Sequence, residues 1–310
     1  MGKTAFIFPG QGSQFVGMGK QLASENEKVA AIFAQADERL GYSLSDIIFN
    51  GPEDDLKRTE HTQPALLTMS TAVLTALQSY DITPDYVAGH SLGEYSALVC
   101  ANALTYSDAV YTVRQRGLFM EEAVPTGEGA MAAILGMERE DLQGITEEVS
   151  NSVASVELAN LNCPGQIVIS GTAEGVEAAS AKAKENGAKR VIPLQVSGPF
   201  HSSLMKPAAE KLSDVLQSVT INDATVPVIA NVTASEITFA TDIKEKLVEQ
   251  VYSPVLWEDS VRKMLDLGVD TFVEIGAGNV LSGLVRKVQR RVNVFSISDS
   301  ESLQKFIEGR

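Results

Sequence analysis

Apolar and polar residues alternate with two different periods along the first part of the chain. Short apolar runs predict strands at residues 4–8 and 85–88. Apolar residues that recur three and four positions apart predict helices, which we place at residues 20–40, 63–80, 92–103 and 107–123. This alternation of strands and helices favours a parallel sheet with helices on both faces.

The pattern changes after a run of turn residues at 125–129, Pro-Thr-Gly-Glu-Gly. The next elements are predicted in the order strand, helix, strand, strand, helix, strand, at residues 130–135, 138–150, 153–161, 166–170, 173–186 and 190–196. That order is the signature of a ferredoxin-like unit. It predicts a small inserted domain at residues 128–197.

The alternation of predicted strands and helices resumes after Gly198 and Pro199. Helices are predicted at residues 203–219, 242–252 and 280–288, and strands at residues 226–231, 271–275 and 293–296. We expect these strands to complete the sheet of the first segment. The predicted division is therefore a large α/β domain made of residues 1–127 and 198–310, and a small domain made of residues 128–197.

Composition narrows the possible classes of function. Of the 310 residues, 44% are hydrophobic and no apolar run approaches the length of a membrane span, so we expect a soluble protein. The first predicted strand starts too early to leave room for a signal peptide. Cys100 and Cys163 form no disulfide framework and match no metal motif, which is typical of a cytoplasmic protein without a metal site. The formal net charge of −15 argues against nucleic-acid or membrane-surface binding.

A turn between a strand and a helix carries the strongest chemical signal. The apolar strand at residues 85–88 runs into Gly-His-Ser-Leu-Gly, with the serine at position 91. In this context the Gly-x-Ser-x-Gly pattern is typical of a nucleophile elbow. Gly89 and Gly93 permit a turn too tight for a Cβ, and the Ser91 hydroxyl is then exposed at the positive end of the helix. An ordinary glycine-rich turn is the alternative, and we favour a nucleophilic Ser91.

A serine hydroxyl is a weak nucleophile unless a neighbouring base takes its proton. The chain has three histidines, at positions 61, 90 and 201. His90 adjoins the serine and should point away from the reaction side, and His61 looks like a solvated loop residue. His201 lies in a loop at the proposed domain junction, where clefts usually form, so by elimination it is the favoured base. The acid of a hydrolase triad is not evident, which weakens an esterase assignment.

Two glycine-rich loops follow predicted strands. The loop at residues 9–14, Pro-Gly-Gln-Gly-Ser-Gln, is followed by Phe15 where a dinucleotide motif has its third glycine. We favour this loop as a second oxyanion donor opposite the N–H of Leu92, with a plain turn as the alternative. The loop from Gly276 to Gly278 resembles a methyltransferase motif, but Val280 stands where the third glycine belongs, so a structural turn is favoured.

Helix 107–123 carries two arginines, Arg114 and Arg116, that could bind an anionic substrate. Arg116 shares an otherwise apolar stripe with Ala109, Val113 and Met120, where an unpaired guanidinium would be costly. Arg114 also has apolar neighbours, so spacing leaves both arginines open. A surface ion pair is the alternative for either of them.

Seven motifs occur in a characteristic order. They are residues 8–14 (Phe-Pro-Gly-Gln-Gly-Ser-Gln), 62–65 (Thr-Gln-Pro-Ala), 89–95 (Gly-His-Ser-Leu-Gly-Glu-Tyr), 116–117 (Arg-Gly), 162–166 (Asn-Cys-Pro-Gly-Gln), 200–201 (Phe-His) and 250–257 (Gln-Val-Tyr-Ser-Pro-Val-Leu-Trp). Together they resemble the bacterial malonyl-CoA:acyl carrier protein transacylase family over essentially the whole chain. The expected fold is α/β, an α/β-hydrolase-like core with a mostly parallel sheet plus an inserted ferredoxin-like small domain.

The resemblance implies a role for each matching residue. Ser91 would be the nucleophile and His201 its base, with the main-chain carbonyl of Gln250 orienting His201 in place of an acid. The backbone N–H groups of Gln11 and Leu92 would form the oxyanion hole. The substrate-binding residues would be Arg116, which would hold a malonyl carboxylate in a bidentate fork, Phe200, which would crowd a 2-methyl branch, Met120 and Asn162.

The implied activity is ping-pong transfer of a malonyl group from malonyl-CoA to the phosphopantetheine thiol of acyl carrier protein, without a cofactor, for fatty-acid chain extension. A serine esterase or thioesterase is the alternative among enzymes, although its acid and its oxyanion loop are missing. A module that binds a nicotinamide dinucleotide or S-adenosylmethionine through one of the glycine loops would form no acyl-serine. An inactive interaction subunit is disfavoured, because Ser91, His201 and Arg116 are all present.

Overall fold

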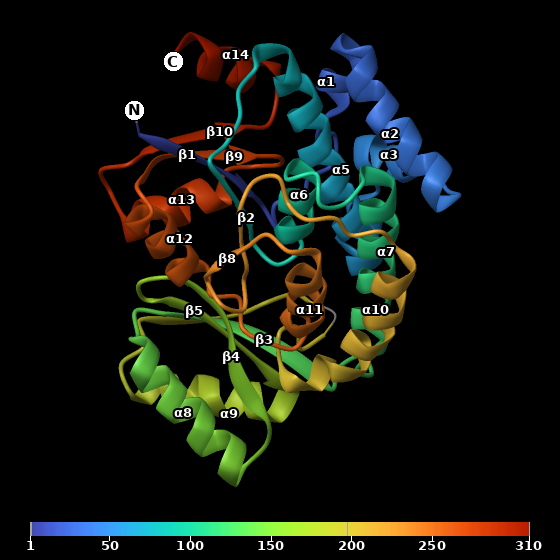
Figure 1. Cartoon of the computed structure of the whole chain (residues 1–310). Helices are drawn as coiled ribbons and strands as arrows, with labels where there is room; N and C mark the ends of the chain where they lie inside the picture. Colours follow the sequence, from blue (N-terminus) through green and yellow to red (C-terminus); the bar gives the residue numbers. More distant parts are fainter. Residues whose placement is uncertain (1, 197, 310) are drawn as a thin grey trace.

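Six strands form the larger of two sheets in the computed structural model, which describes residues 2–196 and 198–309 (Figure 1). The strands are β1 (Lys3–Phe8), β2 (Tyr86–Gly89), β7 (Val228–Ile229), β8 (Glu236–Ile237), β9 (Val269–Ile275) and β10 (Asn293–Ile297). Their spatial order is β10-β9-β1-β2-β7-β8. Neighbours run parallel except β8, which is antiparallel to β7. The chain is therefore α/β with a mixed sheet, and the last strands complete the sheet of the first, as predicted.

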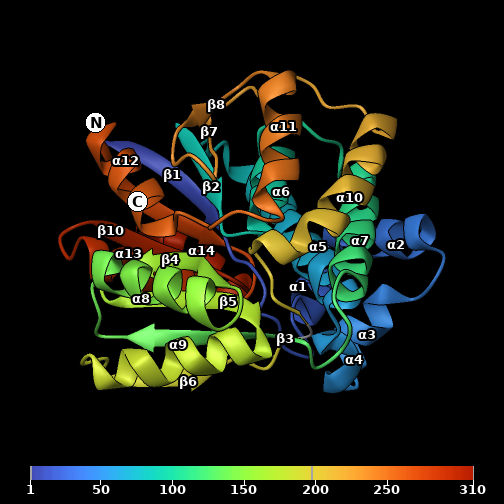
Figure 2. The ribbon, with the colours of Figure 1, turned by 90° about the horizontal axis from the view of Figure 1, so that it is seen from below.

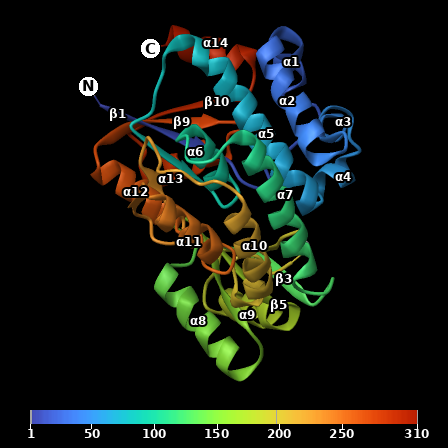
Figure 3. The ribbon, with the colours of Figure 1, turned by 45° about the vertical axis from the view of Figure 1, so that its right-hand side comes forward.

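Both faces of this sheet are buried, because alternate residues of a strand point to opposite sides. Phe6 and Phe8 of β1 join the core that contains α5 (Thr59–Leu77) and α6 (Gly93–Cys100). Ala5 and Ile7 join a second core with α12 (Trp257–Asp266) and α13 (Val280–Val288). In Figures 1 and 3, α13 and α5 accordingly lie on opposite sides of β1 and β9.

The other helices that cover the six-stranded sheet pack on the same side as α5 and join its core. They are α1 (Lys20–Glu25), α2 (Glu27–Leu40), α3 (Leu44–Asn50), α4 (Glu53–Lys57), α7 (Tyr106–Glu122), α10 (Lys206–Ser218), α11 (Ala240–Gln250) and α14 (Ser300–Glu308). Helix α7 packs against both α5 and α10. This packing brings α7 and the loop before α10 to the same region of the molecule, although about 90 residues separate them in the chain.

The second sheet is antiparallel and has the order β4-β5-β3-β6, formed by β3 (Gly129–Leu135), β4 (Val156–Cys163), β5 (Gln166–Thr172) and β6 (Arg190–Pro193). Helices α8 (Arg139–Ser152) and α9 (Ala173–Glu185) share a core with one face of this sheet. Figure 2 shows both helices at the opposite end of the molecule from α2. Met131, Ala159 and Val168, on the other face, join the core that contains α5 and α6. The second sheet therefore packs against the part of the molecule built on the six-stranded sheet.

Several boundaries differ from the predicted ones. The helix predicted at residues 20–40 is broken into α1 and α2 at Asn26, whose side chain accepts the N–H groups of Lys28 and Val29 and so caps α2. Helices α3, α4, α12 and α14 were not predicted, and the strand predicted at residues 226–231 is only two residues long. Helix α4 and strand β7 span only five and two residues, too few periods for a pattern to reveal them. Helices α12 and α14 are at least as long as α13, which was predicted, so their length does not explain why they were missed.

The closest backbone approach lies between β2 and α6. A Cβ added at Gly89 would lie 1.8 Å from the carbonyl carbon of Gly93 and 2.3 Å from the backbone nitrogen of Glu94. Backbone atoms cannot move aside as a flexible side chain can. A Cβ added at Gly93 would in turn lie 2.0 Å from the carbonyl oxygen of Phe8. Both glycines are therefore needed for the tight turn that the sequence predicted.

Replacing Gly89 with alanine should lower the free energy of unfolding by about 3 kcal/mol or more, because the added methyl group overlaps backbone atoms. The matched control is Gly144→Ala in the exposed middle of α8, where a Cβ meets no atom within 4 Å. That change should stabilise the protein by about 0.5–1 kcal/mol. Urea unfolding measures both, and equal midpoints for Gly89→Ala and the unchanged protein would contradict the packing argument.

Candidate active site

Ser91 occupies the turn between β2 and α6 in a left-handed conformation, with φ 51°. A non-glycine residue in this region is strained, and such strain is typical of functional sites. The Ser91 N–H donates a 2.7 Å hydrogen bond to Asn231 Oδ1, and Asn231 Nδ2 donates to the carbonyl of Gly89 at 2.6 Å. The Asn231 side chain thus braces both sides of the strained turn.

His201 lies against the serine hydroxyl, although 110 residues separate them. Its Nε2 is 2.7 Å from Ser91 Oγ, and its Nδ1 is 2.8 Å from the main-chain carbonyl oxygen of Gln250. A carbonyl oxygen can only accept, so Nδ1 carries the proton and Nε2 is free to accept one. The structure therefore brings together the three residues predicted as a catalytic set.

Burial, and secondly the nearby Arg116 guanidinium, lowers the pKa of His201 to about 3. The imidazole is consequently neutral at physiological pH, which is the form that can accept a proton from a serine. His90, by contrast, donates from Nε2 to Asn162 Oδ1 at 2.8 Å and lies beside the ring of Trp257. Only one of the two histidines near Ser91 contacts its hydroxyl, as the sequence argument expected.

The structure distinguishes the two arginines of α7. Arg114 forms an ion pair with Glu60, with Nη1 2.5 Å from Oε2. Arg116 is 1% exposed and its Nη2 donates to Ser91 Oγ at 3.1 Å. Its other contacts are Gln63 Oε1 at 2.8 Å and Gln250 Oε1 at 3.0 Å, and its Nε finds no partner among the described residues. A buried cation with a spare donor therefore faces the candidate nucleophile.

A small cavity of about 120 Å³ opens beside these groups. Its lining includes Gln11 and Leu92, the two predicted oxyanion donors, and the side chains of Met120 and Phe200. The loop that holds Gln11 packs tightly on the elbow, since a Cβ on Gly10 would lie 2.4 Å from the carbonyl oxygen of His90. Asn162 contacts His90, and it is Asn160 of the same strand that lines the cavity, so a substrate-binding role for Asn162 stays a prediction.

Sequence reasoning assigned no role to several residues of the site: Gln63, Glu94, Met131, Asn160, Leu194, Val196 and Asn231. One signal could have found Asn231. It follows β7 by two residues, and the carboxyl ends of parallel strands meet at one edge of a sheet, where β2 also ends. The amide of Gln63 carries no such signal, because α5 brings it to Arg116 only through helix packing.

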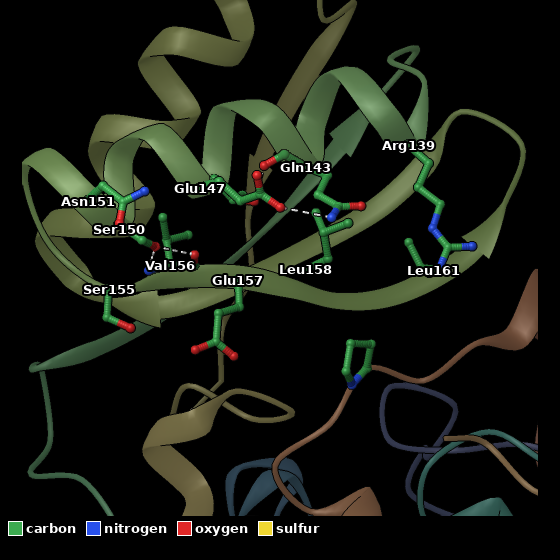
Figure 4. Close-up of a pocket in the computed structure, with 12 residues that line it drawn as sticks. Arg139, Gln143, Glu147, Ser150, Asn151, Ser155, Val156, Glu157, Leu158 and Leu161 are labelled. Atoms are coloured by element: carbon green, nitrogen blue, oxygen red, sulfur yellow. Dashed lines mark hydrogen bonds between the residues drawn. The ribbon is translucent and has the colours of Figure 1, made fainter. Parts of the chain in front are cut away.

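A larger surface groove of about 560 Å³ lies elsewhere, between α8 and β4 (Figure 4). Figure 4 shows Glu157 leaving β4 on the side away from α8, and its carboxylate accepts the N–H of Ser203 at 3.0 Å. Gln143 and Glu147 on the other wall bond to each other. The groove thus offers paired polar groups and none of the predicted catalytic residues.

The glycine loop after β9 also serves the fold. Glu274 at the end of that strand accepts the N–H groups of Leu281 and Ser282 at 3.0 and 2.7 Å. Its buried carboxylate occupies the N-terminus of α13, where a ligand phosphate would bind in a dinucleotide or methyltransferase site. This supports the structural turn that the sequence favoured. No helix of residues 2–196 and 198–309 is long and apolar enough to cross a membrane.

Known proteins resemble this chain over nearly its full length. The family described as acyl transferase domain matches residues 5–305. Malonyl CoA-acyl carrier protein transacylase of Bacillus subtilis (strain 168) is 61% identical over 99% of this chain and 97% of its own, and that of Staphylococcus aureus (strain MW2) is 46% identical over 99% of both chains.

Solved structures agree with these relatives. An acyl carrier protein S-malonyltransferase from Vibrio cholerae has a TM-score of 0.95 and 43% identity, covering 98% of this chain and 99% of that one. A malonyl-transacylase in complex with its type II polyketide acyl-carrier protein has a TM-score of 0.96 and 42% identity, covering 99% and 100%. The chain therefore belongs to the acyl transferase domain family.

Proposed function

We propose that this protein transfers the malonyl group of malonyl-CoA to the phosphopantetheine thiol of acyl carrier protein, through a malonyl ester of Ser91, and so supplies fatty-acid chain extension. The observation that carries the proposal is the 3.1 Å contact between Arg116 Nη2 and Ser91 Oγ in a buried site. In a malonyl thioester, one methylene separates the carboxylate from the reacting carbonyl. A guanidinium beside the nucleophile is thus well placed to hold that carboxylate.

Acylation begins with proton transfer from Ser91 Oγ to His201 Nε2 as the oxygen attacks the thioester carbonyl carbon. The new C–O bond converts the carbonyl oxygen into an oxyanion, for which the N–H groups of Gln11 and Leu92 are the proposed donors. Collapse of this intermediate breaks the C–S bond. The leaving sulfur takes the proton from His201, which releases coenzyme A as a thiol and leaves malonyl-Ser91.

Transfer reverses these steps with a second thiol. His201 Nε2 takes the proton of the phosphopantetheine S–H while the sulfur attacks the ester carbonyl. Collapse breaks the bond to Ser91 Oγ, which recovers its proton from His201. The carbonyl of Gln250 holds the imidazole in place and needs no charge of its own, which accounts for the lack of a triad acid.

Selectivity for the acyl group would come from the cavity wall. Arg116 would pair with the carboxylate through Nε and Nη2, since Nε is otherwise unpartnered among the described residues. Phe200 and Met120 are 5% and 2% exposed and restrict the space near Ser91, which would disfavour a 2-methyl branch. Asn162 would act through His90, whose Nε2 donates to its side-chain oxygen.

We also propose the finer assignment of the fold. The β-α-β-β-α-β order of residues 128–197 and the strand order β4-β5-β3-β6 support a ferredoxin-like small domain. The elbow between β2 and α6 supports an α/β-hydrolase-like core in residues 1–127 and 198–310. A cytoplasmic location stays a prediction from the two free cysteines, Cys100 and Cys163.

Brief exposure to malonyl-CoA should add one malonyl group to Ser91, as seen by intact-protein mass spectrometry with peptide mapping. The adduct should disappear when acyl carrier protein is added, and Ser91→Ala should show none. An adduct that decays equally fast in buffer alone would favour a thioesterase, and no adduct would remove the acyl-serine mechanism.

Arg116→Ala should reduce kcat/KM for malonyl transfer by more than 100-fold, about 3 kcal/mol, and raise acetyl transfer relative to malonyl. The matched control is Arg114→Ala on the same helix, which breaks the pair with Glu60 and should leave acyl selectivity unchanged. The measurement is steady-state transfer with malonyl-CoA and acetyl-CoA. Unchanged selectivity in Arg116→Ala would refute the carboxylate-binding role.

The rate of acylation should not fall as pH decreases from 7 to 5.5. The pKa of His201 lies at about 3, so the imidazole keeps its proton-accepting form through this range. An ordinary histidine base would lose about tenfold in kcat/KM over the same interval. Rapid-quench measurement of malonyl-Ser91 formation against pH tests this, with His201→Ala as the inactive reference.

A further inference from the structure

Glu94 is a buried carboxylate that the mechanism above does not use. It lies in the first turn of α6, three residues after Ser91, and is 1% exposed. Its Oε2 accepts the N–H of Asn231 at 3.0 Å and Nε2 of Gln250 at 2.8 Å. Both donors are neutral amides, so these bonds hold the carboxylate without neutralising it.

The Gln250 side chain joins this carboxylate to Arg116. Its Nε2 donates to Glu94 and its Oε1 accepts from Arg116 Nη2, so an anion and a cation bind opposite ends of one amide. The remaining polar partners of Arg116, Gln63 and Ser91, are neutral. A buried guanidinium without a counter-charge is costly, and Glu94 supplies one through the Gln250 amide.

Few other ionisable groups act on Glu94. Burial raises the pKa of Glu94, and the hydrogen bonds from Asn231 and Gln250, followed by the charge of Arg116 on α7, lower it. The phenol of Tyr95, on the same helix, has its own pKa raised by burial. His201, beside Arg116, stays neutral.

Within residues 2–196 and 198–309, the other elements packed against α6 add no further charge that acts on the carboxylate. On β1 and β2, Lys3 and Tyr86 bond to each other. Glu60 of α5 pairs with Arg114 of α7. After β7, the group that contacts Glu94 is the neutral backbone N–H of Asn231.

We propose that Glu94 is the counter-charge of Arg116 in the empty site and takes up a proton from solvent when the malonyl carboxylate binds to Arg116. This inference rests on the proposed function, because it requires the substrate carboxylate to reach that guanidinium. Without the proton, two anions would share one buried cation. Since both hydrogen bonds to Glu94 end on Oε2, a proton on Oε1 leaves them in place.

The pKa of Glu94 is suited to proton uptake when malonyl binds. Burial raises the pKa of Glu94 to about 7, so the empty site holds a mixture of charged and neutral forms near neutrality. A second carboxylate beside Arg116 should raise that pKa further, by about one unit. Binding at pH 7.5 would then take up roughly half a proton, and affinity for malonyl would fall about fourfold as pH rises from 7 to 8.5.

The test is calorimetry of malonyl-CoA binding to the Ser91→Ala protein, which stops before chemistry. Titrations in phosphate and in Tris at pH 7.5 give the number of protons exchanged, and acetyl-CoA corrects for ionisation of the coenzyme. The dissociation constant is then measured from pH 6 to 8.5 in Ser91→Ala, with and without Glu94→Gln. Glu274→Gln is the matched control, a second buried glutamate at a strand end that caps α13 and bonds no site residue.

We expect about half a proton for malonyl-CoA and none for acetyl-CoA. Glu94→Gln should abolish the uptake and bind malonyl-CoA about tenfold more tightly at pH 8.5, with little change at pH 6, whereas Glu274→Gln should match its parent. Equal pH dependence with and without Glu94→Gln, or no uptake by the parent, would overturn the inference. The parent titration decides the matter even if Glu94→Gln does not fold. If malonyl-CoA binds and acylates Ser91 without proton uptake, the proposed function stands and only this inference fails.

Discussion

The guanidinium of Arg116, buried beside the proposed nucleophile Ser91, is the feature on which the rest of this site depends. Water cannot solvate Arg116, so protein groups must satisfy it: Gln63, Gln250, Ser91 and the ring of Tyr95, which lies 5.7 Å from the guanidinium carbon. These acceptors are all neutral. Among the described residues, Glu94 reaches the guanidinium only through the Gln250 amide, so no carboxylate bonds Arg116 directly. The cation is therefore available to an incoming carboxylate, as selective binding of a charged acyl group requires.

The same cation shapes the acid–base chemistry around it. A positive charge near an imidazole disfavours a second one, so Arg116 adds to burial in keeping His201 neutral. A triad carboxylate against Nδ1 would oppose that effect and would also compete with substrate for the guanidinium. A main-chain carbonyl orients the ring without adding charge. A neutral main-chain partner for His201 Nδ1 thus suits an imidazole that lies beside an arginine.

Rigidity of the elbow is the second requirement. The contact between Gly89 and Gly93 fixes the turn, and the amides of Asn231 and Gln250 bind the main chain on both sides of Ser91, at its N–H and its carbonyl. The strained backbone of the serine is thereby held by hydrogen bonds from two distant segments. A backbone conformation of high energy persists in a folded protein only where several surrounding contacts hold it in place.

The sequence allowed candidate catalytic residues to be predicted from their immediate neighbours, but it did not show which distant residues they contact. Ser91 could be predicted because the need for glycine in a tight turn is a property of adjacent residues, and His201 because the chain offers only three histidines. Periodicity left Arg114 and Arg116 undecided, since two residues on one helix differ only in what other helices bring against them. The family resemblance was needed to choose Arg116 and to point to the carbonyl of Gln250.

Tertiary packing alone decided the rest. It placed the amides of Gln63 and Asn231 on the site and connected Glu94 to Arg116 through Gln250, because these contacts join residues 53 to 156 positions apart and no local rule encodes them. The sequence by itself determined which chemical groups were available and the local turns that expose them. Only the folded arrangement determined which of those groups meet, and therefore which charges must share one buried space.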